Sequence, residues 1–265
     1  MKLLFPLLAF ATILPSGAAP IHSGHASAEL IASSSTFEAS KPVNAAIRLT
    51  VDSGWHTYWT NPGEGGMKLG AEWVLPEGWS AGPLGWPVPI RFKTGDLPGF
   101  GYVGEVIIPV TLTPPPGAPK AARIAVKLDW LTCDESACIP GDAAPTLELS
   151  PGPSADTPSA PIIQKAMSQV PAPLEGLALS VAEEGKALIL TLTAPAGADP
   201  ATMAAFPATP QVVDPAATFK FLKSGASWTA RVSRSEYLEG SPKSLELVIS
   251  GGGLPHPATV VWSKK

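Results

Sequence analysis

Short runs of alternating apolar residues, separated by proline and glycine, are the feature that most constrains how this sequence can fold. Of its 265 residues, 31 are proline and 25 are glycine, and the β-branched residues gather between them. Proline and glycine interrupt helices and mark turns, so this pattern favours strands joined by short loops. Disorder is the competing interpretation, but 45% apolar residues and eight tryptophans indicate packed cores. We therefore expect an all-β protein.

The clearest predicted strand runs from Arg123 to Trp130, where Ile124, Val126, Leu128 and Trp130 all face one way. It leads directly into Cys133, and Thr146–Leu149 is a candidate return strand, so a cysteine-containing loop would join two neighbouring strands. The other strands predicted in this half are residues 46–52, 55–59 and 105–113. Pro109 in the last of these indicates an edge strand or a bulge.

The composition changes after Ser150, where a Pro/Ser/Ala-rich stretch has no apolar period. We interpret residues 151–175 as an interdomain linker with at most a short helix, around residues 162–170. The strand pattern then resumes at residues 177–181, 186–193, 218–222, 227–232, 244–250 and 259–262. The sequence thus predicts two β-sandwich domains, at residues 29–150 and 176–265.

The N-terminus, MKLLFPLLAFATILPSGAA, has one lysine, an apolar run from Leu3 to Leu14 and then small residues. This order is typical of a secretory signal peptide, and the run is too short to span a bilayer. The alternative is a buried N-terminal strand or helix. We expect a signal peptide at residues 1–19, with later cleavage, up to Ala28, left open. The mature chain would then be periplasmic.

Charge and hydropathy exclude several classes of partner. The formal net charge is −4, and the sequence has no basic run and no Lys/Arg stripe with interleaved aromatics. Nucleic acid and anionic membrane surfaces are therefore not expected partners. After the N-terminal run no segment of 18 or more apolar residues occurs, so we expect no membrane insertion of the mature chain. On the exported side, thiols can be oxidised.

The only cysteines, Cys133 and Cys138, lie in the stretch DWLTCDESACIPG. A structural disulfide is the simplest interpretation. So short a ring constrains the unfolded chain only a little, however, which makes the pair a better redox switch than a staple. Asp134 and Glu135 between the cysteines would raise the thiol pKa values if they lie close.

Metal and hydrolase chemistry find little support. Two thiolates need further ligands to hold zinc, but His56 and His256 stand alone, and four methionines form no cluster for copper. No Cys/His/Asn arrangement suggests a cysteine hydrolase. We expect neither a metal site nor a cofactor.

Four motifs carry a family resemblance: GWHTYWTNPGEGG at residues 54–66, GWPVPIRF at 85–92, GYVGEVIIPV at 101–110 and DWLTCDESACIPG at 129–141. In this order they resemble the periplasmic N-terminal region of DsbD-type and ScsB-type thiol:disulfide interchange proteins. The likeness covers residues 29–150, and residues 177–265 resemble the second β domain of the ScsB-like branch. It implies an immunoglobulin-like first domain whose redox-active cysteine pair passes electrons from a transmembrane hub to periplasmic acceptors.

The resemblance also implies roles for individual residues. Cys138 would attack partner disulfides and Cys133 would resolve the mixed disulfide. Family members have three or five residues between these cysteines, whereas this chain has four. An aromatic cap loop covers the pair in the family, and Phe100 and Tyr102 are its candidates here. Ordinary core aromatics are the alternative for both.

Two functional hypotheses follow. The first is a periplasmic relay in thiol-disulfide exchange, with protein-disulfide reductase activity left open. Its partners would be thioredoxin-fold periplasmic proteins and a separate CcdA/DsbD-like membrane electron donor, because the membrane hub and thioredoxin-like domain of complete family members are not in this sequence. The second is a non-catalytic binding module with a structural disulfide, acting in cytochrome c biogenesis or copper-tolerance assemblies.

Overall fold

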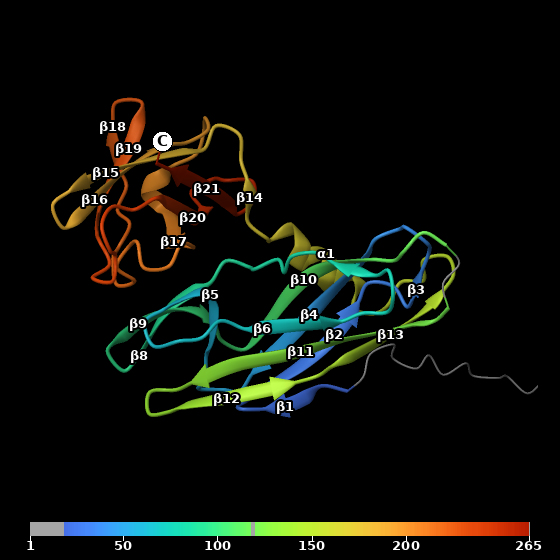
Figure 1. The fold of residues 1–265 in the computed structure, drawn as a ribbon. Helices are drawn as coiled ribbons and strands as arrows, with labels where there is room; N and C mark the ends of the chain where they lie inside the picture. The colour runs from blue at the N-terminus through green and yellow to red at the C-terminus, as the bar shows by residue number, and fades with distance from the viewer. Residues whose placement is uncertain (1–18, 118–119, 265) are drawn as a thin grey trace, which may run out of the picture.

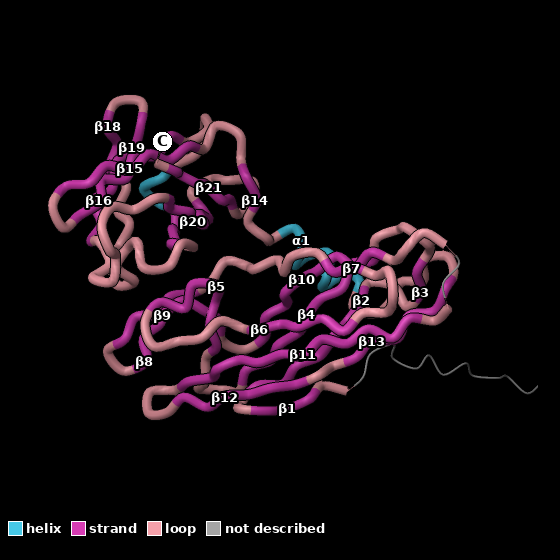
Figure 2. Tube along the Cα trace, viewed as in Figure 1, coloured by secondary structure: helices cyan, strands magenta, loops and turns pink. Residues whose placement is uncertain are grey.

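The computed structural model describes residues 19–117 and 120–264, so the signal-peptide prediction lies almost entirely outside the described residues. Strands dominate the chain (Figure 2), as the all-β prediction requires. Figure 1 shows two β domains, joined by a segment that carries the short helix α1. Within the described ranges, no helix is long and apolar enough to cross a membrane.

The first domain is a sandwich of two sheets with a smaller third sheet at one end. The first sheet has the order β1 (Ile21–Ser23), β2 (Ala26–Ala32), β4 (Val43–Val51), β10 (Glu105–Thr113) and β7 (Ser80–Ala81). The facing sheet contains β12 (Cys138–Ala143), β11 (Ala122–Cys133), β13 (Thr146–Pro151) and β3 (Thr36–Phe37), and β6 (Gly70–Val74) also pairs with β11. The third sheet consists of β5 (Thr57–Gly63), β9 (Leu97–Tyr102) and β8 (Ile90–Thr94).

Alternation along β11 and β4 builds the core of this sandwich. Ile124, Val126 and Trp130 of β11 are fully buried and share one apolar cluster with Ile47 and Leu49 of β4. The intervening residues of β11 face outward, as the period of a strand requires. Apolar burial between the two sheets therefore holds β11 in place, and the predicted strand at residues 123–130 is confirmed.

The helix α1 (Ala160–Ser168) packs against the outer face of the first sandwich. Ile163 and Ala166 are buried there in a small cluster with Ile31, Ala46 and Ile107 from β2, β4 and β10. The segment that we expected to act as a linker is thus anchored to the first domain along its helix.

The second domain is another sandwich of two four-stranded sheets. One contains β14 (Ala172–Pro173), β21 (Ala258–Ser263), β20 (Ser244–Gly251) and β17 (Met203–Pro207). The other contains β15 (Ala178–Glu184), β16 (Ala187–Thr193), β19 (Ser227–Ser233) and β18 (Leu222–Ser224). A single 3-10 turn, η1 (Pro200–Thr202), precedes β17.

One predicted strand in this domain is wrong. Residues 218–221 form no strand, and β18 begins only at Leu222. Phe219 and Phe221 nevertheless pack against the core of the second domain from a loop. Their alternation therefore reflects burial of two rings rather than a ladder of backbone hydrogen bonds.

The packing of α1 yields a first prediction. Replacing Ile163 with alanine should destabilise the first domain by about 2–4 kcal/mol, because a fully buried aliphatic side chain leaves a cavity. Met167→Ala on the same helix is the matched control, since Met167 is exposed and should cost little. Denaturant unfolding of both variants measures the difference. Equal effects would show that α1 does not depend on this contact.

Candidate functional site: the cysteine hairpin

The strand β11 and the return strands β12 and β13 form one long hairpin whose tip carries both cysteines (Figure 1). The ladder pairs Ala122 with Leu149 at its base and Cys133 with Cys138 at its tip, in unbroken register. β12 and β13 are two parts of the same arm, interrupted at residues 144–145. Because Cys133 pairs with Cys138 in this register, the four residues between them, 134–137, form the loop at the tip.

The cysteine pair occupies a position of the ladder at which side chains approach closely. The backbone N–H and C=O of Cys133 bond to the carbonyl and amide of His56, at 3.0 and 2.9 Å, on the other edge of β11. Its backbone groups therefore point away from Cys138, so the two cysteines form a non-hydrogen-bonded pair. In antiparallel sheets this kind of pair has the shorter Cα separation. The two Cα atoms are 4.1 Å apart, and the sulfurs form a disulfide.

The carboxylate of Asp134 fixes the turn between the cysteines. Its Oδ1 accepts hydrogen bonds from the backbone N–H groups of Ser136 and Ala137, at 2.7 and 2.8 Å, and from the Ser136 hydroxyl at 2.9 Å. The Ser136 amide, then the Ala137 amide and the Ser136 hydroxyl, hold the pKa of this carboxyl below its ordinary value. The negative charge of Asp134 is thus stabilised by hydrogen bonds from within the turn.

The two sulfur-bearing residues differ sharply in exposure. Cys133 is 0% exposed, whereas Cys138 and the following Ile139 and Pro140 are exposed. The exposed side of the disulfide is therefore the Cys138 side. Thiol–disulfide exchange needs one accessible sulfur and one leaving sulfur, and this asymmetry is compatible with that chemistry.

A tyrosine hydroxyl supports the buried sulfur. The Tyr58 hydroxyl donates a hydrogen bond to Cys133 Sγ at 3.0 Å, from a ring that is 1% exposed. Gly66 leaves room for this ring, because a Cβ atom there would lie 2.2 Å from it. Burial raises the pKa of the Tyr58 hydroxyl, so it remains a donor at neutral pH.

Thr94 of β8 and His56, which directly precedes β5, extend the polar contacts of Tyr58. Thr94 Oγ1 lies 2.8 Å from His56 Nε2 and 3.4 Å from the Tyr58 hydroxyl. The ring of Phe92 packs beside both, with centroids 3.9 Å from His56 and 5.5 Å from Tyr58. Burial is the main cause that lowers the pKa of His56, partly opposed by the charge of Asp134, so the imidazole is neutral at pH 7.

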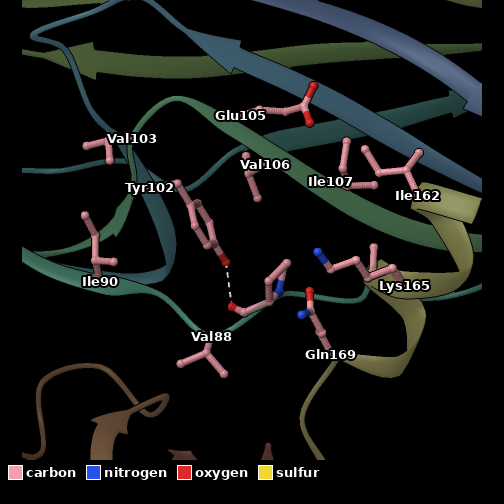
Figure 3. Close-up of a pocket in the computed structure, with 12 residues that line it drawn as sticks. Val88, Ile90, Tyr102, Val103, Glu105, Val106, Ile107, Ile162, Lys165 and Gln169 are labelled. Carbon is pink, nitrogen blue, oxygen red and sulfur yellow. Dashed lines mark hydrogen bonds between the residues drawn. The ribbon is translucent and has the colours of Figure 1, made fainter.

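The two aromatic residues expected in the cap loop lie on β9, in the same small sheet as Phe92. Phe100 is fully buried, with ring contacts to Trp59 and to Phe206 of the second domain. Tyr102 borders a cavity of about 340 Å³ between β10 and α1, lined in part by Glu105 and Lys165. Figure 3 shows its hydroxyl hydrogen-bonded beside Val88, and the acceptor is the Pro87 carbonyl at 2.7 Å.

Sequence reasoning missed Tyr58, His56, Thr94 and Phe92 as neighbours of the cysteines. His56 and Tyr58 are two residues apart on a strand, which places them on one face, and this alternation was the available signal. Their meeting with Cys133 depends on a pairing between distant parts of the chain.

Metal-ligating side chains do not gather at this site. Across residues 19–117 and 120–264, His, Cys, Asp and Glu form no group of three or more that could hold a metal ion. His22 and His25 instead each lie 3.2 Å from the same carboxylate oxygen of Asp52.

Comparison with known proteins identifies the domain that carries the hairpin. Residues 27–149 match the family model described as "Thiol:disulfide interchange protein DsbD, N-terminal". No curated protein sequence gives a significant match. Among solved structures, the N-terminal periplasmic domain of ScsB from Proteus mirabilis is similar, with a TM-score of 0.71 and 20% sequence identity. The similarity covers 94% of this chain and 98% of that one, so both domains share its fold.

The cysteine hairpin, with its disulfide, lies inside the matched segment. Residues 27–149 therefore form a domain of the kind that the DsbD N-terminal family model describes.

Proposed function

We propose that the protein is a periplasmic thiol-disulfide exchange component that relays electrons through Cys133 and Cys138. The observation that supports this most directly is the asymmetry of the pair. Cys138 is exposed to a partner, and Cys133 is buried with its sulfur hydrogen-bonded by Tyr58. A disulfide that served only as a staple would need neither feature.

In the loading half of the cycle, a donor thiolate attacks Cys138 Sγ. The bond between the two sulfurs breaks, and Cys133 leaves as a thiolate that the Tyr58 hydroxyl stabilises. The donor's second thiol then attacks its own sulfur in the mixed disulfide and releases Cys138. The donor ends as a disulfide, and two electrons reside in the Cys133/Cys138 dithiol.

In the unloading half, the Cys138 thiolate attacks an oxidised partner's disulfide and releases one partner thiol. Cys133, deprotonated, then attacks Cys138 Sγ and releases the partner's second thiol. The pair is oxidised again and the partner is reduced. The roles follow from exposure, because only Cys138 offers a sulfur to a second protein.

Thioredoxin-fold periplasmic proteins are the proposed partners, with a separate membrane protein as electron donor. The domain family supports this, since it belongs to thiol:disulfide interchange proteins. A cavity lined in part by Trp55, Phe92 and Val103 offers an apolar surface beside His56, which pairs with Cys133. An aromatic surface of this kind suits transient protein contacts. We also propose Phe92 as the cap aromatic, because it contacts the residues that support Cys133.

Export through the N-terminal signal would require cleavage before the first strand. β1 begins at Ile21, and Ala26 and Ala28 of β2 are fully buried between the sheets. Cleavage after Ala28 would remove these strand residues, whereas cleavage after Ala18 or Ala19 would leave them in place. We therefore favour the earlier site.

Trapping tests the assigned roles. The Cys133→Ser variant should accumulate a mixed disulfide between Cys138 and an added oxidised thioredoxin-fold protein, because no resolving thiol remains. Cys138→Ser is the matched control and should trap far less, since Cys133 is buried. Mass spectrometry of the non-reduced mixture identifies the linked cysteines. Trapping mainly through Cys133 would reverse the roles, and trapping by neither would contradict the relay.

The Tyr58 contact gives a kinetic prediction. Tyr58→Phe should slow reduction of the disulfide by dithiothreitol about three- to tenfold, because a hydrogen bond to a departing thiolate contributes on the order of 1 kcal/mol. The matched control is Tyr237→Phe, since Tyr237 is exposed in the second domain. Alkylation of free thiols at timed intervals gives the rate. An unchanged rate would show that Tyr58 does not assist the leaving sulfur.

Stability separates the relay from a non-catalytic module with a structural disulfide. Reduction should cost less than about 2 kcal/mol, because the ring is short and contributes at the low end of the usual range. Thermal unfolding with and without reductant, at matched pH, measures the cost. Loss of the cooperative transition on reduction would instead assign the disulfide a structural role and favour the binding module.

A further inference from the structure

The edge strand β17 of the second domain lies against the small sheet that supports the cysteine site (Figure 1). β17 pairs only with β20, so its other edge is free of strand partners within its sheet. Alternate residues of an antiparallel edge strand direct their carbonyls away from the neighbouring strand, and Ala205 and Pro207 occupy those positions. These two carbonyls need hydrogen-bond donors from elsewhere.

The first domain supplies the donors from β5 and β8. The amide of Asn61 on β5 donates to the Pro207 carbonyl at 2.7 Å, and Asn61 is itself buried. The guanidinium of Arg91 on β8 donates to the Ala205 carbonyl at 2.9 Å and to the Pro215 carbonyl at 3.0 Å. Each of the two strands is thereby tied to the second domain.

Aromatic rings from both domains surround the Arg91 guanidinium. Its central carbon lies 4.9 Å from the ring centroid of Phe100, 5.3 Å from that of Phe206 and 5.7 Å from that of Phe219. Phe206 belongs to β17 and meets Phe100 edge-on at 6.1 Å. The guanidinium is thus held by cation–π contacts as well as by carbonyls, although part of the Arg91 side chain stays exposed.

The other face of the β8–β9 hairpin contacts the side chains around Cys133. Side chains of a strand alternate between faces, so Phe92 and Thr94 lie opposite Arg91. There they contact His56. Gly99 pairs with Phe92, and a Cβ atom at this position would lie 2.5 Å from the Phe92 ring, so the close packing requires glycine. One face of the hairpin therefore carries the interdomain contact, and the other carries the site.

We infer that the second domain positions the redox site, by holding β8 through Arg91 and β5 through Asn61 so that Tyr58 stays hydrogen-bonded to Cys133. Arg91 is a positioning residue that acts through Tyr58 and does not touch the sulfurs. The inference concerns the disulfide itself, so it can hold or fail independently of which partners the protein serves.

The test is a double-substitution cycle on the oxidised, full mature chain. Dithiothreitol reduces the disulfide and is itself oxidised to its cyclic form, so no protein partner is needed. We expect Arg91→Ala to slow reduction about three- to tenfold, as loss of charge-assisted hydrogen bonds loosens the hairpin. In the Tyr58→Phe background the same change should have no further effect, because the hydrogen bond from Tyr58 to Cys133, through which Arg91 acts, is already absent.

Arg231→Ala is the matched control, since Arg231 is an exposed arginine of the second domain paired with Glu184. It should leave the rate unchanged. Phe219→Ala approaches the contact from the other domain and should slow reduction in the same direction, by less. Circular dichroism confirms that each variant is folded.

Three results would overturn the inference. An unchanged rate in folded Arg91→Ala would show that the second domain does not position the site. A faster rate would show that the hairpin shields the disulfide instead of supporting it. Effects of Arg91→Ala and Tyr58→Phe that multiply in the double variant would show that Arg91 acts independently of Tyr58.

Discussion

The register of the β11 hairpin is the constraint on which the cysteine pair depends. Because side chains alternate along a strand, a slip of one residue would separate Cys133 from Cys138 and turn the core face of β11 towards solvent. Ile124, Val126 and Trp130 are fully buried, so the core resists such a slip along the whole strand. The register is therefore fixed by packing away from the tip. Under the proposed function, this packing would keep the domain folded while the disulfide opens and closes.

The same hairpin explains why the two cysteines differ chemically. One edge of β11 is covered at its end by His56, which buries Cys133 and brings Tyr58 to its sulfur. The opposite arm reaches Cys138 at an exposed turn that Asp134 stabilises with hydrogen bonds from Ser136 and Ala137. A symmetric pair would expose two equivalent sulfurs. Here the neighbours of each arm leave Cys138 exposed and Cys133 buried, which is the asymmetry that the proposed relay uses.

The strand that carries Cys133 could be predicted from the sequence more readily than the residues that surround the cysteines. Alternation predicted the strand at residues 123–130, because inward burial is encoded locally. β12 was not predicted, since Pro140 and Gly141 obscure a strand whose pairing comes from the hairpin. Tyr58 and Cys133 are 75 residues apart in the chain, and only the folded sheet brings them together. Phe219 and Phe221 caused the opposite error, a strand predicted where none forms. Their alternation reflects two rings that pack against the core from a loop.

A relay site must satisfy two opposing demands. The attacked sulfur has to stay accessible, which favours an exposed turn, while the leaving sulfur needs a fixed donor, which favours rigid surroundings. In this molecule the exposed turn belongs to the first sandwich alone, and the donor Tyr58 sits on a small sheet at its end. Such a sheet, with three short strands, has little core of its own. The carbonyls of Ala205 and Pro207 in the second domain accept hydrogen bonds from Arg91 and Asn61 of this sheet, so under the inferred coupling the second domain adds the rigidity that the donor Tyr58 needs.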